Sequence, residues 1–217
     1  MPRYNILIGC DQNYFDKWGT ILLQSIQYHS PWINLHCHIV NPTKENIYNN
    51  INITTETRNF TSEDSKISYL QAVRFLAVNE KFDKNDCTVT LDADSICTSS
   101  FDKDEFSKLF DHQYILQHHK EDRWLAGFVT FCDNGYAKEL ADELHMQPVD
   151  NWKYGRDQDV MSKLANKYDY KVLPRKWMSI GKNKANSYFL TLKGNQKETD
   201  KYLKRYRIYQ NFMKWGL

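Results

Sequence analysis

The 217-residue chain lacks several features that would assign it to a specialised class of protein. It has no apolar run long enough to span a membrane, so we expect no transmembrane segment. Its 29 basic and 27 acidic residues leave a formal net charge of only +2, which gives no overall field to attract nucleic acid or a membrane surface. Residues 1–3 lead directly into an apolar segment, so we also expect no signal peptide.

Cysteine is scarce, and its placement argues against a disulfide framework or a zinc site. The five cysteines form no C-x-x-C pair, and their number is odd. Most of them lie in or beside apolar, strand-like runs, so we expect reduced thiols, a reducing compartment and a cytoplasmic location. No internal repeat, low-complexity linker or clean boundary divides the sequence, which predicts one domain over residues 1–217.

The first forty residues alternate between strand and helix patterns. Residues 4–10 predict a buried strand, residues 11–14 a polar loop, and residues 16–30 a helix with Asp16 as its N-cap. Residues 35–40 predict a second strand. This order indicates a βαβ unit in an α/β protein. Its loops gather at the carboxyl ends of the strands, where open α/β sheets bind ligands.

The remaining pattern continues the alternation. It predicts helices over residues 65–81, 102–110, 137–145 and 160–168, strands over 113–117, 126–132, 170–173 and 187–192, and an irregular or edge segment over 43–61. A last helix over 197–215 carries tyrosines on one face and basic residues on the other. Such a helix can bind RNA or a membrane surface. More often it packs against its own domain, and we favour that reading.

The chain is organised around residues 87–96. A β-branched, apolar run predicts a buried strand that ends at Asp92-Ala93-Asp94. Two unpaired carboxylates cannot both face a core, and extended geometry sends both side chains to the same side. Convergent carboxylates suit Mg²⁺ or Mn²⁺, and such a metal usually binds a diphosphate. The alternative is an ordinary Asp-rich turn, and D-x-D alone is a weak signal.

Other motifs accompany this one in a fixed order. They are C-D-Q-N-Y at residues 10–14, an arginine at 74, L-D-A-D at 91–94, A-G-F-V at 126–129, D-Q-D at 157–159, L-P at 173–174 with Trp177, and K-G-N-Q-K at 193–197. Together they resemble the nucleotide-sugar glycosyltransferases of the GT-A fold, most closely the glycogenin-like group that includes bacterial lipooligosaccharide galactosyltransferases. The chain also resembles the amino-terminal transferase domains of capsid-glycosylating enzymes of large algal viruses.

The resemblance implies both a fold and an activity. The fold would be a GT-A (Rossmann-like) α/β domain with a mixed, mainly parallel central sheet flanked by helices. Residues 1–95 would form its nucleotide-binding half, and residues 96–217 the sugar and acceptor half. The activity would be transfer from a UDP-sugar, with Mn²⁺ or Mg²⁺, to a hydroxyl of a glycan or glycoprotein acceptor. Further domains of a longer polypeptide could carry part of the acceptor site. A retaining reaction is favoured, and an inverting one stays open.

The resemblance also assigns roles on the base and phosphate side of the donor. Asp11 would accept the N3–H of uracil, Asn13 would bind the base or ribose, and Tyr14 would stack on the ring. Arg74 would reach the diphosphate as a forked donor. The structural alternatives are a polar loop with a core tyrosine and an exposed surface arginine.

The sugar and metal side follows in the same way. The implied donor-binding set is completed by Asp92, Ala93, Asp94, Gly127, Gly194 and Lys197, with Asp92 and Asp94 as metal ligands. Gln158 or Asp157 would lie near the anomeric carbon of a retaining enzyme, and Asp157 would be the base of an inverting one. Carboxylates at a helix N-terminus are also ordinary capping residues.

Two departures and three rival functions accompany this interpretation. The family's metal-binding histidine falls at Thr191 and its asparagine at Leu125, while His118 and His119 are weak substitutes as ligands. A sugar nucleotidyltransferase would release pyrophosphate, and a non-catalytic nucleotide-sugar-binding domain would turn nothing over. An aspartyl-phosphate phosphohydrolase would need a threonine where Ile96 stands.

Overall fold

The computed structural model describes residues 2–83, 86–117, 123–132, 134–180 and 187–191. In these residues one seven-stranded sheet has the order β3-β2-β1-β4-β7-β6-β8, and a small sheet has the order β5-β10-β9. The large sheet is built from β1 (Tyr4–Asp11), β2 (Asn34–Val40), β3 (Ile51–Glu56), β4 (Cys87–Leu91), β6 (Tyr114–Gln117), β7 (Trp124–Phe131) and β8 (Lys171–Val172). The small sheet is built from β5 (Ile96–Cys97), β9 (Met178–Ile180) and β10 (Phe189–Thr191).

Helices connect and cover these strands. They are α1 (Gln12–Tyr14), a π-helical turn (Phe15–Gly19), α2 (Thr20–His29), α3 (Glu63–Lys81), α4 (Lys103–Ser107), a 3₁₀ turn (Lys108–Phe110), α5 (Asn134–His145), a second 3₁₀ turn (Val149–Asn151) and α6 (Arg156–Leu164). The strong patterns therefore gave the right elements. The short strands β5 and β9 were not predicted, and the predicted helix over 197–215 lies outside the described residues.

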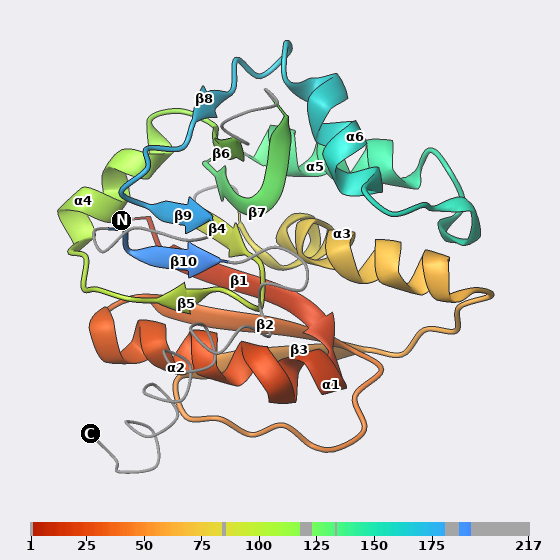
Figure 1. Cartoon of the computed structure of the whole chain (residues 1–217), viewed down its shortest axis with the longest axis horizontal. Coiled ribbons are helices and arrows are strands. Elements are labelled where there is room, and N and C mark those ends of the chain that lie inside the picture. Colours follow the sequence, from red (N-terminus) through yellow and green to blue (C-terminus); the bar gives the residue numbers. More distant parts are fainter. Residues whose placement is uncertain (1, 84–85, 118–122, 133, 181–186, 192–217) are drawn as a thin grey trace.

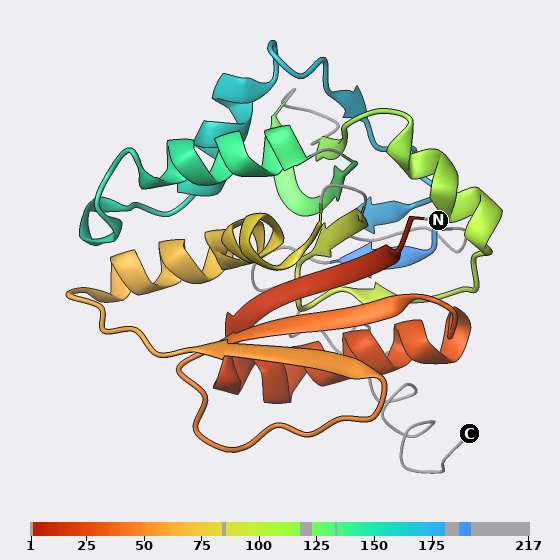
Figure 2. The same ribbon diagram turned by 180° about the vertical axis from the view of Figure 1, so that it is seen from behind.

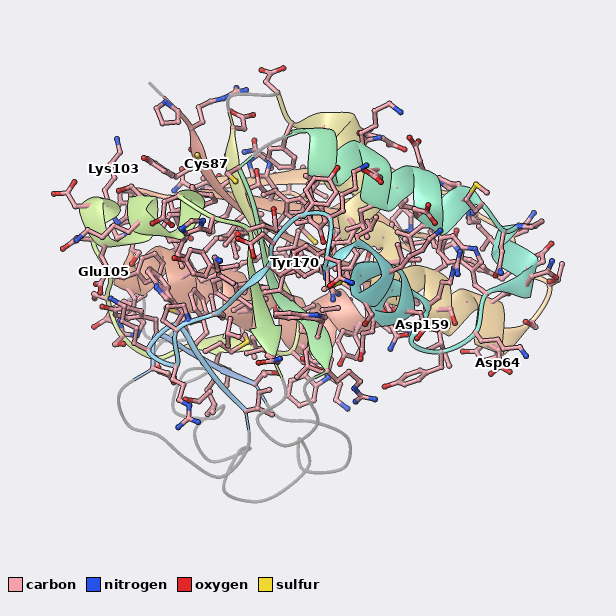
Figure 3. The ribbon with its side chains drawn as sticks, turned by 90° about the horizontal axis from the view of Figure 1, so that it is seen from above. Asp64, Cys87, Lys103, Glu105, Asp159 and Tyr170 are labelled. Carbon is pink, nitrogen blue, oxygen red and sulfur yellow. The ribbon has the colours of Figure 1, made fainter. Side chains whose placement is uncertain are left out.

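The large sheet lies between α2 on one side and α3, α5 and α6 on the other (Figures 1 and 2), and each side has its own hydrophobic cluster. Alternation along β1 explains the division, because successive side chains of a strand point to opposite faces. Ile6, Ile8 and Cys10 pack with α2, α4 and the small sheet, whereas Leu7 packs with α3, α5 and α6. Seen from above, α4 lies at the end of the molecule opposite to Asp64 of α3 and Asp159 of α6 (Figure 3).

The strand directions correct one prediction. The α/β class, the flanking helices and the mixed sheet are confirmed, but the sheet is not mainly parallel. Parallel order joins β3, β2, β1 and β4, and also joins β6 to β8, whereas β7 runs antiparallel to both β4 and β6. The reason is the short connection over residues 118–123, since a parallel crossover needs about a dozen residues or more.

No helix of the described residues is both long and apolar enough to cross a membrane.

All five cysteines lie within the described part of the chain and none forms a disulfide, as expected. Burial raises the pKa of the Cys97 thiol to about 12, so this thiol is protonated and unreactive at neutral pH.

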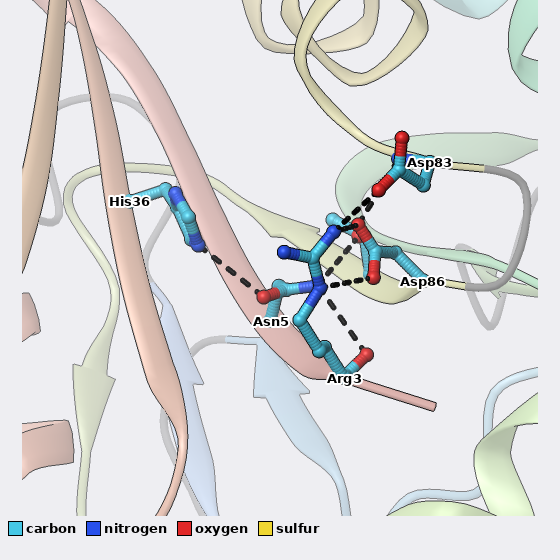
Figure 4. Close-up of polar contacts among 6 residues, drawn as sticks. Arg3, Asn5, His36, Asp83 and Asp86 are labelled. Carbon is cyan, nitrogen blue, oxygen red and sulfur yellow. Dashed lines mark hydrogen bonds and ion pairs between the residues drawn. The ribbon is translucent and has the colours of Figure 1, made fainter. Parts of the chain in front are cut away.

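A polar cluster closes the amino-terminal edge of the large sheet (Figure 4). Arg3 donates to both oxygens of the buried Asp86, at 2.8 and 2.9 Å, and to Asp83 at 2.7 Å. His36 Nε2 lies 3.2 Å from Asn5 Oδ1, and burial lowers the pKa of His36 to about 4. These contacts tie the start of β1 to the start of β4. They lie at the sheet edge opposite to the carboxyl ends of these strands, so we interpret the cluster as structural.

Candidate functional site

A cavity of about 610 Å³ opens at the carboxyl ends of β1 and β4. Its wall combines the β1–α1 junction, the turn after β4, part of β6 and β7, one face of α3, the start of α6, and Thr191 of β10. Most of the predicted site residues line it: Asp11, Tyr14, Arg74, Asp92, Ala93, Asp94, Gly127, Asp157 and Gln158. Asn13 is exposed and is not part of the lining, while Gly194 and Lys197 lie outside the described residues.

The β1–α1 junction differs from the polar loop that we predicted. Helical structure begins directly after the strand, because the extended Asp11 is itself an N-cap whose Oδ1 accepts from the Tyr14 N–H at 2.8 Å. Asp16, predicted as the N-cap, instead lies inside the π-helical turn. Gln12 is buried and bonds to Asn46 and Asp16. The junction is thus a capped turn that holds Asp11 and Tyr14 at the cavity.

Asp92 and Asp94 lie in a turn rather than on an extended strand end. The strand β4 ends at Leu91, and the Ser95 N–H donates to the Asp92 carbonyl at 3.0 Å. The backbone is therefore the Asp-rich turn of the alternative reading, but both carboxylates still line the cavity. Asp94 is 3% exposed, and its Oδ2 accepts a hydrogen bond from the Tyr14 hydroxyl.

Arg74 is not a surface residue, since only 4% of it is exposed. One guanidinium nitrogen lies 2.9 Å from Asp92 Oδ1 and donates to the Ala126 carbonyl at 2.9 Å. Its Nε has no hydrogen-bond partner among the described residues. α3 can bring Arg74 this close because Gly9 of β1 has no side chain. A Cβ there would lie 2.7 Å from Val73 Cγ1 and 2.9 Å from the Arg74 nitrogen.

Asp157 contributes a second buried carboxylate to the same wall. It lies in the first turn of α6, is 2% exposed, and accepts from the Gln158 N–H at 2.9 Å. Burial raises the pKa of Asp157, the positive charge of Arg74 opposes this rise, and the negative charge of Asp92 adds to it. Asp157 does not occupy the N-cap position, which belongs to Gly155 with a positive φ of 85°. The guanidinium of Arg74 therefore acts on two carboxylates: it forms an ion pair with Asp92, and its charge lowers the pKa of Asp157.

The oxygen-rich wall can be compared with what a divalent cation requires. Among the described residues, no group of three or more His, Cys, Asp or Glu side chains is placed to hold a metal. Mg²⁺ usually keeps several waters and binds through one or two carboxylates plus substrate phosphates. The pair Asp92 and Asp94 fits an ion completed in that way. Thr191, at the position where the glycosyltransferases that the motifs resemble have a histidine, is buried and lines the cavity, and His118 and His119 lie outside the described residues.

Sequence reasoning missed the outer half of the cavity. One face of α3 lines it, through Glu63, Lys66, Ile67, Leu70 and Gln71. Tyr154 and Ser162 face them from the α6 side, and Tyr154 is 75% exposed. The signal was present, because these α3 residues precede Arg74 at helical spacing. Helical spacing alone, however, indicates a helix and not the wall of a binding site, and the predicted helix over 65–81 leaves out Glu63.

The main-chain N–H of Gly155 donates to Gln71 Oε1 at 3.4 Å and ties the loop before α6 to α3. This contact joins the two walls of the outer cavity.

No family model matches the chain, and no curated protein matches it in sequence.

Proposed function

We propose that the chain is a metal-dependent glycosyltransferase of the GT-A fold, which moves a sugar from a UDP-sugar to a hydroxyl of a glycan or glycoprotein. One observation carries the proposal: the motif residues from five distant segments of the chain line one cavity. Asp11 and Tyr14 come from the β1–α1 junction, Arg74 from α3, Asp92 and Asp94 from the turn after β4, Gly127 from β7, and Asp157 and Gln158 from α6. An ordinary Asp-rich turn does not require such convergence.

The charge of the lining supports a cation-assisted site for an anionic ligand. The carboxylates that line the cavity are Asp11, Glu63, Asp92, Asp94, Asp157 and Asp159. The cations that line it are Lys66, Arg74 and Arg123, and Arg74 is already paired with Asp92. A diphosphate would be repelled by this excess of negative charge unless a divalent cation came with it.

The proposed chemistry divides among the chain's own residues. Asp92 and Asp94 would hold Mn²⁺ or Mg²⁺, which when bound supplies positive charge that stabilises the departing UDP. Arg74 would hold Asp92 in place and add positive charge beside the phosphates. Gln158 is only partly buried and could present its amide oxygen to the anomeric centre in a retaining reaction. In the inverting alternative Asp157 would accept the acceptor's proton.

The outer half of the cavity would take the acceptor. It is lined by the apolar side chains of Ile67 and Leu70, the exposed ring of Tyr154, and the polar groups of Glu63 and Lys66. A sugar has an apolar face that packs on an aromatic ring and hydroxyls that bond to charged groups, so this mixed lining suits a sugar ring.

The proposal is tested by measuring UDP release. The purified chain is incubated with a panel of UDP-sugars and Mn²⁺, with and without a glycan acceptor, and Asp94→Asn serves as the inactive control. We expect slow UDP release that EDTA abolishes. Pyrophosphate release from UTP and a sugar 1-phosphate would instead indicate a nucleotidyltransferase. Metal-dependent UDP binding without any turnover across the panel would indicate a non-catalytic binding domain.

A further inference from the structure

We propose that the Tyr14 hydroxyl positions the carboxylate of Asp94 for the metal ion, a role separate from stacking on the nucleotide base. This inference rests on the proposed function. The observation that supports it is a hydrogen bond: the Tyr14 hydroxyl donates to Asp94 Oδ2, and both residues line the cavity. A bond to one oxygen fixes the plane of the carboxylate and so the direction of its lone pairs.

Tyr14 is well anchored for such a role. Its own N–H is held at 2.8 Å by Asp11 Oδ1, the cap that starts helical structure directly after β1. Asp94 is 3% exposed, so water competes poorly for the bond from Tyr14. Asp94 therefore takes its orientation from the carboxyl end of β1, an element far from it in sequence.

The two proposed ligands are held in parallel ways. Asp92 is held by the guanidinium of Arg74 from α3, and Asp94 by the phenol of Tyr14 from α1. The partner of Asp92 is charged and would compete with a cation for that carboxylate. The Tyr14 hydroxyl is a neutral donor and leaves the negative charge of Asp94 intact. Tyr14 can therefore keep its bond while a metal binds, and we assign it as a positioning residue.

The variant Tyr14→Phe tests this assignment because it removes the hydroxyl and keeps the ring. Mn²⁺ binding to the full chain is followed by electron paramagnetic resonance of the free ion, without nucleotide. Loss of an outer-shell partner typically weakens metal binding about 10- to 100-fold, so we expect the Kd for Mn²⁺ to rise about tenfold. Binding of uridine, which has no phosphate to contact the metal, is followed by ligand-observed NMR and should be unchanged.

Tyr188→Phe is the matched control. Tyr188 also donates to a carboxylate, that of Glu105, but neither residue belongs to the cavity lining. This variant should bind Mn²⁺ as the wild type does. Thermal unfolding of both variants verifies that they are folded.

Three results would overturn the inference. An unchanged Kd for Mn²⁺ in Tyr14→Phe would refute the positioning role while leaving the proposed function intact. Equal weakening of uridine and Mn²⁺ binding would assign the hydroxyl to the nucleotide instead. Failure of the wild-type chain to bind Mn²⁺, alone or with UDP, would remove the proposed function and this inference with it.

Discussion

The substitution Gly127→Ala, which adds one methyl group, should weaken metal binding while leaving the free energy of unfolding nearly unchanged. A Cβ at this position of β7 would lie 2.8 Å from Asp92 Oδ2, and 3.5 Å from both Asp92 Cγ and Leu116 Cδ2. The obstructing atom is the end of a side chain that is 38% exposed, so it can move into the cavity. That movement breaks the 2.9 Å contact between Asp92 and Arg74 and turns the carboxylate away from its position at the metal site.

For Gly127→Ala, the stability gained from alanine in a strand and the stability lost with the ion pair between Asp92 and Arg74 nearly cancel. Alanine in place of glycine favours a strand by roughly 0.5–1 kcal/mol. A partly exposed ion pair contributes up to about 1 kcal/mol, and this contribution is lost when Asp92 moves. We therefore expect Gly127→Ala to change the free energy of unfolding by less than about 1 kcal/mol. Its Kd for Mn²⁺ should nevertheless rise about tenfold, because one of the two proposed ligands is displaced.

Gly9→Ala is the contrasting variant on the neighbouring side of the cavity. Its Cβ would meet the backbone nitrogen of Arg74 at 2.9 Å and Val73 Cγ1 at 2.7 Å, so helix α3 itself must shift. Overpacking of this kind destabilises by about 1–3 kcal/mol. We expect the melting temperature to fall by about 2–12 °C, at about 2–4 °C per kcal/mol for a chain of this size.

Urea denaturation and Mn²⁺ titration of both variants provide the assay. The account predicts that Gly127→Ala keeps its stability and loses metal affinity, whereas Gly9→Ala loses stability. Destabilisation of Gly127→Ala by 2 kcal/mol or more, or wild-type affinity for Mn²⁺ in that variant, would show that Asp92 is not displaced as argued.

Three further predictions follow from the same contacts. Arg74→Met should destabilise the chain by about 3 kcal/mol at pH 7 in urea denaturation, because Asp157 is left buried without its cation. Part of this loss should return at pH 5, since the variant's Asp157 takes up a proton in the folded state. His36 has a folded-state pKa of about 4 against 6.5 unfolded, so the unfolded chain binds the proton first and stability falls between pH 6.5 and 4. His36→Gln should show a smaller fall, and an equal fall would refute this role. Tyr154→Ala should raise the KM for the acceptor about tenfold and leave the Kd for UDP unchanged, and the reverse pattern would place Tyr154 on the donor side.

Much of the fold was predictable because its signals are local. Buried strands such as residues 4–10 and 87–91 carry runs of apolar and β-branched residues, and α3 carries a helical period with a serine cap. The direction of β7 depends instead on the length of the connection before it. Treating residues 118–123 as a hairpin-length link would have given the antiparallel pairing from the sequence.

The candidate site was predictable as a set of residues but not as a set of contacts. Motifs placed Asp94, Tyr14 and Arg74 near one another, yet nothing local in sequence indicates that a tyrosine eighty positions away donates to Asp94. The capping role of Asp11 was also missed, because strand and helix meet without the intervening loop that the polar residues suggested. The outer wall on α3 has no motif, and only the fold brings it opposite Tyr154.

Calorimetric titration of UDP into the chain, first with Mn²⁺ and then with EDTA, tests the central claim most directly. The account predicts binding with Mn²⁺ that is lost or strongly weakened in EDTA and in Asp94→Asn, which keeps the shape of the side chain and removes its charge. No binding of UDP under any of these conditions, or equal binding with Mn²⁺ and with EDTA, would contradict the assignment of this cavity to a metal-bound UDP-sugar.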